Sequence, residues 1–260
     1  MRFFARIILI VFMFLCSAEV VFAYEPNDYL NKETKYYYNE MTDEEKAIYE
    51  NILNGVVNFE ERISIKCTSE RQLYEVLMKF RADFPEIFWL AESYKYGSND
   101  NNEIICVYLG YVYTKDGIDE INKIIKETID KLKDRTKDMT ELEKAREIFD
   151  FTCEKIKYNK ETFNPINVDQ AFINGDAICG GYAKMYCILA NGVGLKCKMA
   201  VGCRILEADV GHSWNEVYIE NDVVYVDCTW GDSSQKRGKE NSYFNTEKEE
   251  FLEKHNETII

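Results

Sequence analysis

The chain has 260 residues, of which 46% are hydrophobic and 14% aromatic, and it carries a net charge of −14 at pH 7. This length and composition fit one large or two small globular domains with a sizeable core. The acidic balance argues against nucleic-acid binding and against docking on anionic lipid by charge. Neutral or basic partners are favoured instead.

The first residues are typical of an export signal. Two arginines precede an apolar run over residues 7–15, and Ala23 stands where a signal peptidase needs a small residue. An uncleaved anchor is the alternative, but a bilayer span needs ~20 apolar residues. A lipoprotein at Cys16 is a second alternative, without the usual small residue before the cysteine. We expect residues 1–23 to be a cleaved signal peptide, so that the mature chain is secreted or at the cell surface, with no membrane attachment.

The region up to residue 135 predicts a small α+β unit of its own. Its apolar residues recur at helical spacing in some segments and alternate in others. We expect a polar lead-in over 27–39, a helix that Thr42 caps, a strand over 57–65, a helix over 69–80, strands over 85–90 and 103–113 around a loop over 97–102, and a helix over 116–133.

The second half predicts helices and an antiparallel sheet. We expect a helix over 138–157 that Thr140 caps together with Glu143, helices over 179–191 and 246–254, strands over 195–203, 211–218 and 223–230, and a polar loop over 233–241. His255, at the end of the last helix, is interpreted as a helix-terminal charge.

Cys179 is expected in the first turn of its helix, followed by Gly180 and Gly181. Glycines are poor helix formers, so their presence there indicates that bare backbone comes close to another part of the chain. A helix start favours thiolate over thiol and makes the sulfur a better nucleophile. Taken alone, Cys179 could equally be a buried structural cysteine.

His212 and Asp227 lie in two strands joined by a short turn. If the turn is Glu220-Asn221, Trp214 lies opposite Asp227, and His212 is a diagonal neighbour of that carboxylate on the same face. We prefer this register to the one with the turn a residue later. The chain then supplies a base and an orienting carboxylate for a cysteine nucleophile.

Three motifs carry a family resemblance. The stretches 177–183, 211–217 and 225–232 resemble the helix, histidine-strand and aspartate-strand motifs of the transglutaminase-like superfamily, a bacterial secreted branch of the papain-like Cys-His-Asp fold. The resemblance implies Cys179 as nucleophile, His212 as base and Asp227 as the residue that orients the base.

The resemblance also implies an α+β fold, in which the nucleophile helix packs on an antiparallel sheet. We expect residues 24–135 to be an accessory α+β region and residues 136–260 the catalytic domain. Trp214 and Trp230 are candidate walls of a substrate cleft. Gly180, where relatives often carry a larger polar residue, is expected to shape the leaving-group side.

The predicted activity is thiol-dependent acyl transfer or hydrolysis of amide or peptide bonds through a thioester. A secreted cysteine peptidase or amidohydrolase acting on a protein or peptide, in some settings at the cell wall, is the leading hypothesis. A protein-glutamine transglutaminase and a binding module that keeps the fold are the alternatives. Gln170 is a weak candidate for a second oxyanion donor beside the backbone N–H of Cys179.

Eight cysteines remain after signal cleavage, and most are expected to be small core hydrophobes. Their spacings contain no CxxC pair and the chain has only two histidines, so no metal site is expected. No cofactor is expected either.

Overall fold

The computed structural model describes residues 35–164, 166–204, 207–236 and 243–256, so the predicted signal peptide lies outside the described residues. The helices are α2 (Tyr36–Glu40), α3 (Asp43–Val57), α4 (Glu70–Asp83), α5 (Lys115–Thr136), α6 (Glu141–Lys155), α7 (Val168–Ile173), α8 (Cys179–Gly192), α9 (Cys228–Gln235) and α10 (Lys248–Leu252). The strands are β1 (Arg62–Cys67), β2 (Leu90–Ser98), β3 (Ile104–Tyr111), β4 (Lys157–Tyr158), β5 (Asp176–Ala177), β6 (Lys196–Arg204), β7 (Glu207–Ile219), β8 (Asp222–Val226) and β9 (His255–Asn256).

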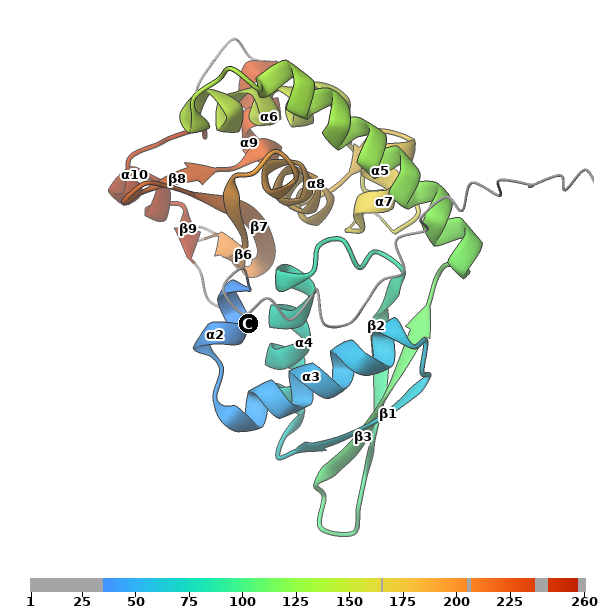
Figure 1. Cartoon of the computed structure of the whole chain (residues 1–260). Helices are drawn as coiled ribbons and strands as arrows, with labels where there is room; N and C mark the ends of the chain where they lie inside the picture. The colour runs from blue at the N-terminus through green and yellow to red at the C-terminus, as the bar shows by residue number, and fades with distance from the viewer. Residues whose placement is uncertain (1–34, 165, 205–206, 237–242, 257–260) are drawn as a thin grey trace, which may run out of the picture.

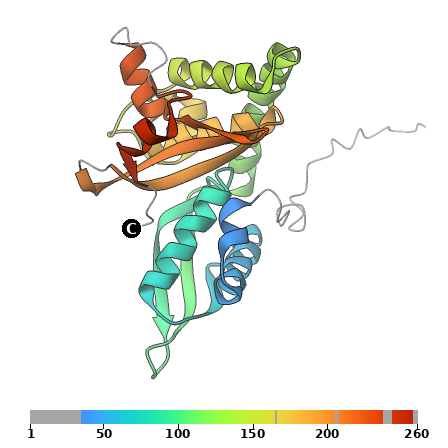
Figure 2. The same ribbon diagram turned by 90° about the vertical axis from the view of Figure 1, so that its left-hand side faces the viewer.

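The described part of the chain forms two lobes (Figure 2). The accessory lobe is an antiparallel sheet in the order β1-β3-β2, with α3 and α4 packed against β1. Burial alternates along β1, so one face of this sheet is covered. Thr42 and Glu45 form a capping box at the start of α3, and Ser69 caps α4. Local caps therefore fix where both helices begin.

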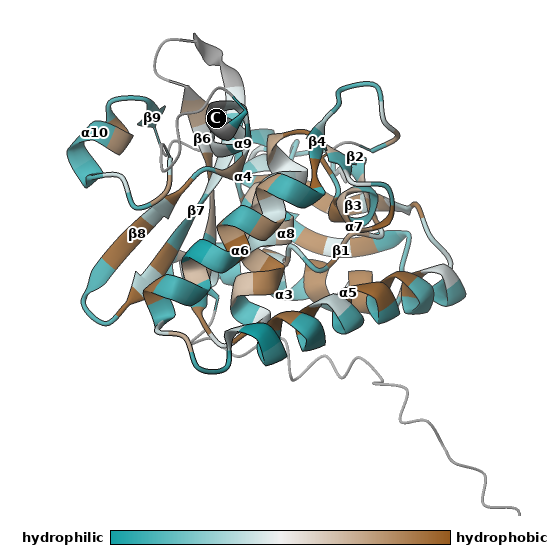
Figure 3. Cartoon of the chain, turned by 90° about the horizontal axis from the view of Figure 1, so that it is seen from above, coloured by the Kyte–Doolittle hydropathy of each residue, from teal (hydrophilic) through white to brown (hydrophobic). Residues whose placement is uncertain are grey.

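The second lobe is built on a four-stranded antiparallel sheet in the order β8-β7-β6-β9. The helix α8 contacts β6 and β7 and is enclosed on its other sides by α5, α6 and α7 (Figure 1). Viewed from above, α5 and α6 each show a hydrophobic and a hydrophilic side (Figure 3). The mixed α+β fold, with the cysteine-bearing helix on an antiparallel sheet, is confirmed.

The long helix α5 joins the two lobes. One cluster of buried apolar residues extends from Tyr38 to Phe244 and includes Ile118, Ile121 and Leu132 of α5. A methyl group placed on Gly192 of α8 would lie 2.9 Å from carbons of Ile129, so the two helices touch closely. The predicted boundary at residue 135 falls at the end of a helix that belongs to the core of the second lobe.

The hairpin that carries His212 and Asp227 has the preferred register. Asn215 pairs with Val226 and Ile219 with Asp222, so the turn is Glu220-Asn221. Glu220 has φ of 53°, the left-handed conformation that tight hairpin turns use. The helices from Thr42 and Thr140, both with capping boxes, are also confirmed.

Several predicted boundaries are wrong. The run 85–90 is a turn region rather than a strand, because short buried apolar runs do not distinguish strand from loop. The strand predicted over 57–65 begins only at Arg62, since α3 continues to Val57, and β2 extends through the predicted loop to Ser98. The lead-in contains α2.

The strand predicted over 223–230 is β8, which ends at Val226. It is followed by α9, where more strand and then a loop were expected. Asp227 causes this change, because its Oδ1 accepts a hydrogen bond from the backbone N–H of Trp230 at 3.0 Å and so caps α9. Residues 237–242 of the predicted loop lie outside the described residues. Within the described ranges, we find no helix with the length and apolar character needed to cross a membrane.

Candidate active site

Cys179 is the first residue of α8 and is partly exposed, whereas the other seven cysteines of the described chain are buried and free. Among the described helices of 14 residues or more, α8 is the one without a side-chain cap at its start. The N–H of Gly181 donates to the Ile178 carbonyl at 2.9 Å, so the amides of Cys179 and Gly180 are the first-turn donors outside the helix's own hydrogen bonds. An accessible sulfur and uncapped donors meet at one point.

Gly180 explains how this helix start fits its surroundings. A methyl group placed there would lie 2.8 Å from Cγ2 of Ile166 and 3.2 Å from its carbonyl oxygen. Gly180 is buried, and the chain that approaches it is the segment before α7. The expected close approach of bare backbone is confirmed, and its partner is Ile166.

Asn215 connects the helix that carries Cys179 to the sheet that carries His212. It is fully buried, and its Nδ2 donates to the Ala183 carbonyl of α8 at 3.0 Å and lies 3.4 Å from the Lys198 carbonyl of β6. The sequence analysis did not single out this residue. Its place in the histidine motif was the available signal, since a buried asparagine needs partners.

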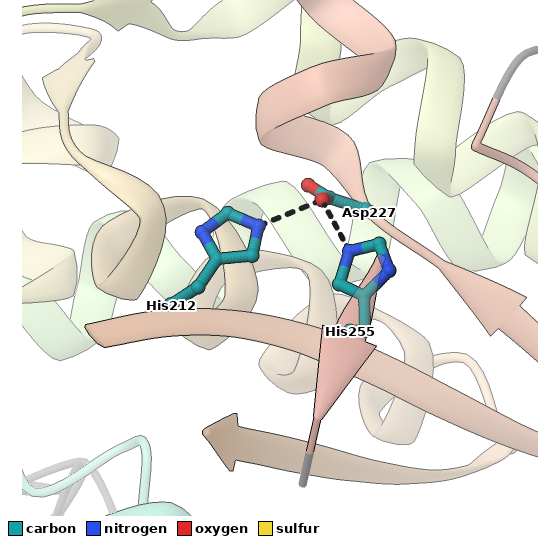
Figure 4. A group of neighbouring side chains, drawn as sticks. All are labelled: His212, Asp227 and His255. Carbon is teal, nitrogen blue, oxygen red and sulfur yellow. Dashed lines mark hydrogen bonds and ion pairs between the residues drawn. The ribbon is translucent and has the colours of Figure 1, made fainter. Parts of the chain in front are cut away.

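His212 and Asp227 are adjacent in the structure. Nε2 of His212 lies 2.8 Å from Oδ2 of Asp227, and both side chains are fully buried (Figure 4). Nδ1 is then the ring nitrogen left for the thiol, and it has no hydrogen bond of ordinary geometry within the described residues. Cys179 lies close enough to affect the titration of this ring.

His255 is also part of this cluster. Its Nε2 lies 3.0 Å from the same Oδ2 of Asp227, and its Nδ1 lies 2.9 Å from the carbonyl oxygen of Phe251 (Figure 4). The interpretation as a helix-terminal residue fits the contact with the Phe251 carbonyl in the last turn of α10, but it is incomplete, because the residue belongs to β9 and is buried against the carboxylate. The contact between β9 and Asp227 could not be predicted from spacing in the sequence.

The two tryptophans have different surroundings. Trp230 is partly exposed and stacks on His212, with ring centroids 4.8 Å apart. Trp214 is only 1% exposed and packs edge-on against His255 and Phe251. A ring this buried has no surface to offer a substrate, so the structure supports a cleft-wall position for Trp230 and not for Trp214.

His212 and Asp227 each stabilise the charged form of the other. Burial lowers the pKa of His212, but the charge and hydrogen bond of Asp227, together with the Cys179 thiol, raise it from 6.5 to about 9. Burial raises the pKa of Asp227, yet its two histidine partners outweigh burial and hold it well below the usual range. At neutral pH the site therefore favours imidazolium beside the sulfur.

The side-chain amide of Gln170, the weak candidate for a second oxyanion donor, is hydrogen-bonded within its own segment. Its Nε2 donates to Asp169 at 2.9 Å, and its Oε1 accepts from Asn174 at 2.7 Å. Both ends of the amide are engaged on α7 and the residue that follows it.

Metal-ligating atoms do meet in the site, although the spacings did not indicate it. One donor atom each of His212, Asp227 and His255 lies within 4.8 Å of the others. These atoms are already matched to one another as hydrogen-bond donors and acceptor. A metal ion would have to replace those contacts.

A thiol at a helix start, beside a histidine that a buried carboxylate holds, is the arrangement that a cysteine acyl-transfer site requires. Residues 130–230 match the family described as the transglutaminase-like superfamily. The match covers less than half of the chain, so this segment is similar to a transglutaminase-like domain, and members of that superfamily are usually enzymes. The matched segment contains Cys179, His212 and Asp227 but ends before His255.

Comparison with an individual curated protein gives a weaker likeness. The chain is 25% identical to the human (Homo sapiens) kyphoscoliosis peptidase over 147 residues, which are 50% of this chain and 20% of that protein. The chain thus spans a fifth of the length of that relative.

Two solved structures share part of the fold. A crystal structure of a TGase has 13% identity and a TM-score of 0.38, covering 65% of this chain and 50% of that one. A protein provisionally assigned as a cysteine protease from Cytophaga hutchinsonii has 11% identity and a TM-score of 0.34, covering 53% and 61%. At these scores the likenesses carry no argument about function.

Proposed function

We propose that this chain is a secreted cysteine amidohydrolase or peptidase that cleaves an amide bond of a protein or peptide through a thioester. The observation that carries the proposal is the position of His212, whose Nε2 is held by Asp227 while its ring interacts with the Cys179 thiol. Each of the three residues then has the role that its chemistry suits.

In the first step the Cys179 thiolate attacks the acyl carbon of the substrate. The backbone N–H of Cys179, at the uncapped start of α8, is the donor for the oxyanion that forms. His212 gives its proton to the departing amine, and the amine leaves a thioester on the sulfur. Asp227 holds the ring in orientation and stabilises its cationic form.

In the second step neutral His212 takes a proton from water, and the resulting hydroxide attacks the thioester and releases the acid. Water is the favoured acceptor because Cys179 is partly exposed. A transglutaminase must instead exclude water at ~55 M and admit an amine. The acidic groups Asp43-Glu44-Glu45 also lie in an ordinary first helix turn, where they match no calcium loop.

The decisive experiment offers the mature chain a glutamine-rich protein and a fluorescent alkylamine together. We expect release of ammonia or new amino termini to exceed amine incorporation at millimolar amine, and both to be lost in Cys179→Ala. Incorporation that exceeds hydrolysis would establish the transglutaminase alternative. No product and no covalent acyl adduct on Cys179 would favour the binding module.

The extracellular location is part of the same proposal. An apolar run over 7–15 followed by Ala23 supports it. Expression of the full chain in a secreting bacterium, with amino-terminal sequencing of the exported product, should give a chain that begins at Tyr24. A product that keeps residues 1–23 would contradict export by cleavage.

A further inference from the structure

His255 and His212 share one oxygen of Asp227. The two Nε2 atoms lie 3.0 and 2.8 Å from Oδ2, while Oδ1 accepts the backbone N–H of Trp230. The carboxylate is thus held by three donors from three different segments, and Figure 4 shows the two histidines among them. The mechanism above uses only one of these, the ring of His212.

The partners of His255 determine its protonation. A backbone carbonyl can only accept a hydrogen bond, so Nδ1, 2.9 Å from the Phe251 oxygen, must carry a proton. An ionised carboxylate also only accepts, so Nε2 must carry one as well. Both contacts are satisfied at once only when the ring is doubly protonated and positively charged.

The surroundings of His255 suit a buried cation. The Phe251 ring stacks on it with centroids 3.8 Å apart, and the rings of Trp230 and Trp214 lie at 4.7 and 4.9 Å. Aromatic rings stabilise a cation placed against them, and the adjacent carboxylate supplies the countercharge.

The backbone keeps His255 in place. β9 pairs with the end of β6, where Arg204 is the register partner of His255. A methyl group on Gly202 would lie 2.0 Å from the carbonyl oxygen of Asn256, so only glycine admits this strand. The pairing of β9 with β6 therefore fixes the backbone of His255 at the edge of the sheet.

We propose that His255 is a positioning residue of the active site, an imidazolium that fixes Asp227 and balances its charge, so that Asp227 orients His212 without trapping its proton. This inference rests on the proposed function for its catalytic meaning. With His255 charged, the buried groups Asp227, His255 and His212 and the partly exposed Cys179 sum to zero when the thiolate–imidazolium pair is formed. Without it, they carry one net negative charge.

The consequence concerns the second step of the reaction. Removing a cation whose ring centre lies 5.6 Å from that of His212 makes the His212 cation easier to form and the thiolate harder to form. His212 then gives up its proton less readily and serves less well as a base toward water. The charged groups that face His255 are Asp227, from the start of α9, and His212, from β7. On its own segment, Lys254 pairs with Glu250 at 3.9 Å.

The first test reads protonation directly in the intact mature chain. The sequence has two histidines, so a ¹⁵N spectrum of the imidazole rings contains only two spin systems, and His255→Gln assigns them. We expect both ring nitrogens of His255 to be protonated at neutral and mildly alkaline pH, as long as the protein is folded. A neutral His255 ring at pH 7 would overturn the proposal.

The second test measures the pH dependence of Cys179 alkylation by iodoacetamide. We expect His255→Gln, which can still donate to Asp227 but has no charge, to move both limbs of the profile upward by on the order of one pH unit. Turnover should fall more in kcat than in KM. Leu252→Ala is the matched control, because it loosens the packing of the same cluster and leaves the aromatic rings around His255 and its charge in place.

The outcomes separate the two proposals. An unchanged profile in His255→Gln, or an equal shift in Leu252→Ala, would contradict the role of the charge. Slow alkylation of Cys179 in the parent protein would instead count against the proposed function, while the ¹⁵N spectrum would still decide the state of His255. The spectrum also decides if His255→Gln fails to fold.

Discussion

The two lobes differ in what they bury. In the accessory lobe Asp83 is the buried charged residue among those described, whereas the second lobe buries many polar side chains. These are Thr136, Thr152, Asn167, Asp169, Gln170, Lys184, Lys198, His212, Ser213, Asn215, Glu216, Asp227, Asp232 and His255. A buried polar group destabilises a fold unless it is hydrogen-bonded. The stability of the second lobe therefore depends on many more buried hydrogen bonds of polar side chains than that of the accessory lobe.

Asp83 and Asp227 show what the difference means. Asp83 accepts from the backbone N–H groups of Tyr37 and Tyr38 and from the Tyr49 hydroxyl, at 3.0, 2.9 and 2.9 Å. Asp227 also has three donors, but two of them are histidines, and one of these, His212, changes charge during the proposed reaction. One carboxylate closes a structural network, and the other holds a site that can titrate.

The lobes meet at another buried charge. Lys184 of α8 donates to Oδ1 of Asn167 at 3.1 Å and lies 3.9 Å from Glu92 of β2. Burial lowers the pKa of Lys184, and Glu92 only partly offsets this. The nucleophile helix is therefore fixed to the accessory lobe by polar as well as apolar contacts.

The largest effect is expected from Asp227→Asn. Asparagine has one acceptor oxygen and one NH₂ group, so it cannot accept from His212, His255 and the Trp230 N–H together. We expect turnover to fall by about 10²- to 10⁴-fold. Steady-state kinetics on the glutamine-rich protein used in the assay above measure this, with circular dichroism to show that the fold is retained. Activity within threefold of the parent would remove Asp227 from the site.

Asp83→Ala should have the largest effect on stability and none on the site. It leaves three buried donors without an acceptor, and we expect a loss of about 4 kcal/mol in the free energy of unfolding. Urea unfolding measures the loss, and the pH profile of Cys179 alkylation should be unchanged below the transition. A shifted profile would show that the lobes are coupled through more than stability.

The pH dependence of stability should come from the second lobe. The pKa of His212 is raised in the folded chain from 6.5 to about 9, so its stabilisation is fully present below 6.5 and is lost as the pH rises through about 9. The expected change is about 3 kcal/mol. Urea midpoints measured across this range should lose the slope in His212→Gln and keep it in Asp83→Asn.

The smallest effects should be equal in the two lobes. Thr42 and Thr140 form the same capping box at the starts of α3 and α6. We expect Thr42→Ala and Thr140→Ala each to cost about 1 kcal/mol in urea unfolding, since each loses the hydrogen bond that its hydroxyl accepts from the N–H three residues on. A loss several times larger at Thr140 would mean that the second lobe depends on local caps more than its shared core suggests.

Local chemistry in the sequence determined much of the fold. Thr42 and Thr140 fixed helix starts because their partners lie three residues away, and the turn at Glu220 fixed the hairpin register because side chains alternate along strands. Alternation alone placed His212 and Asp227 on one face, and that register made them diagonal neighbours. The glycine after Cys179 correctly indicated close backbone contact. Each of these inferences needed only a few consecutive residues.

Only the tertiary structure decided the rest of the site. His255 reaches Asp227 because β9 adds to the far edge of the sheet, and Trp214 is enclosed because Phe251 of α10 covers that face. Ile166 and Asn215 gained their roles from α8 in the same way. Charge balance and burial depend on which distant segments meet, and a local pattern contains no information on such a meeting until the chain has folded.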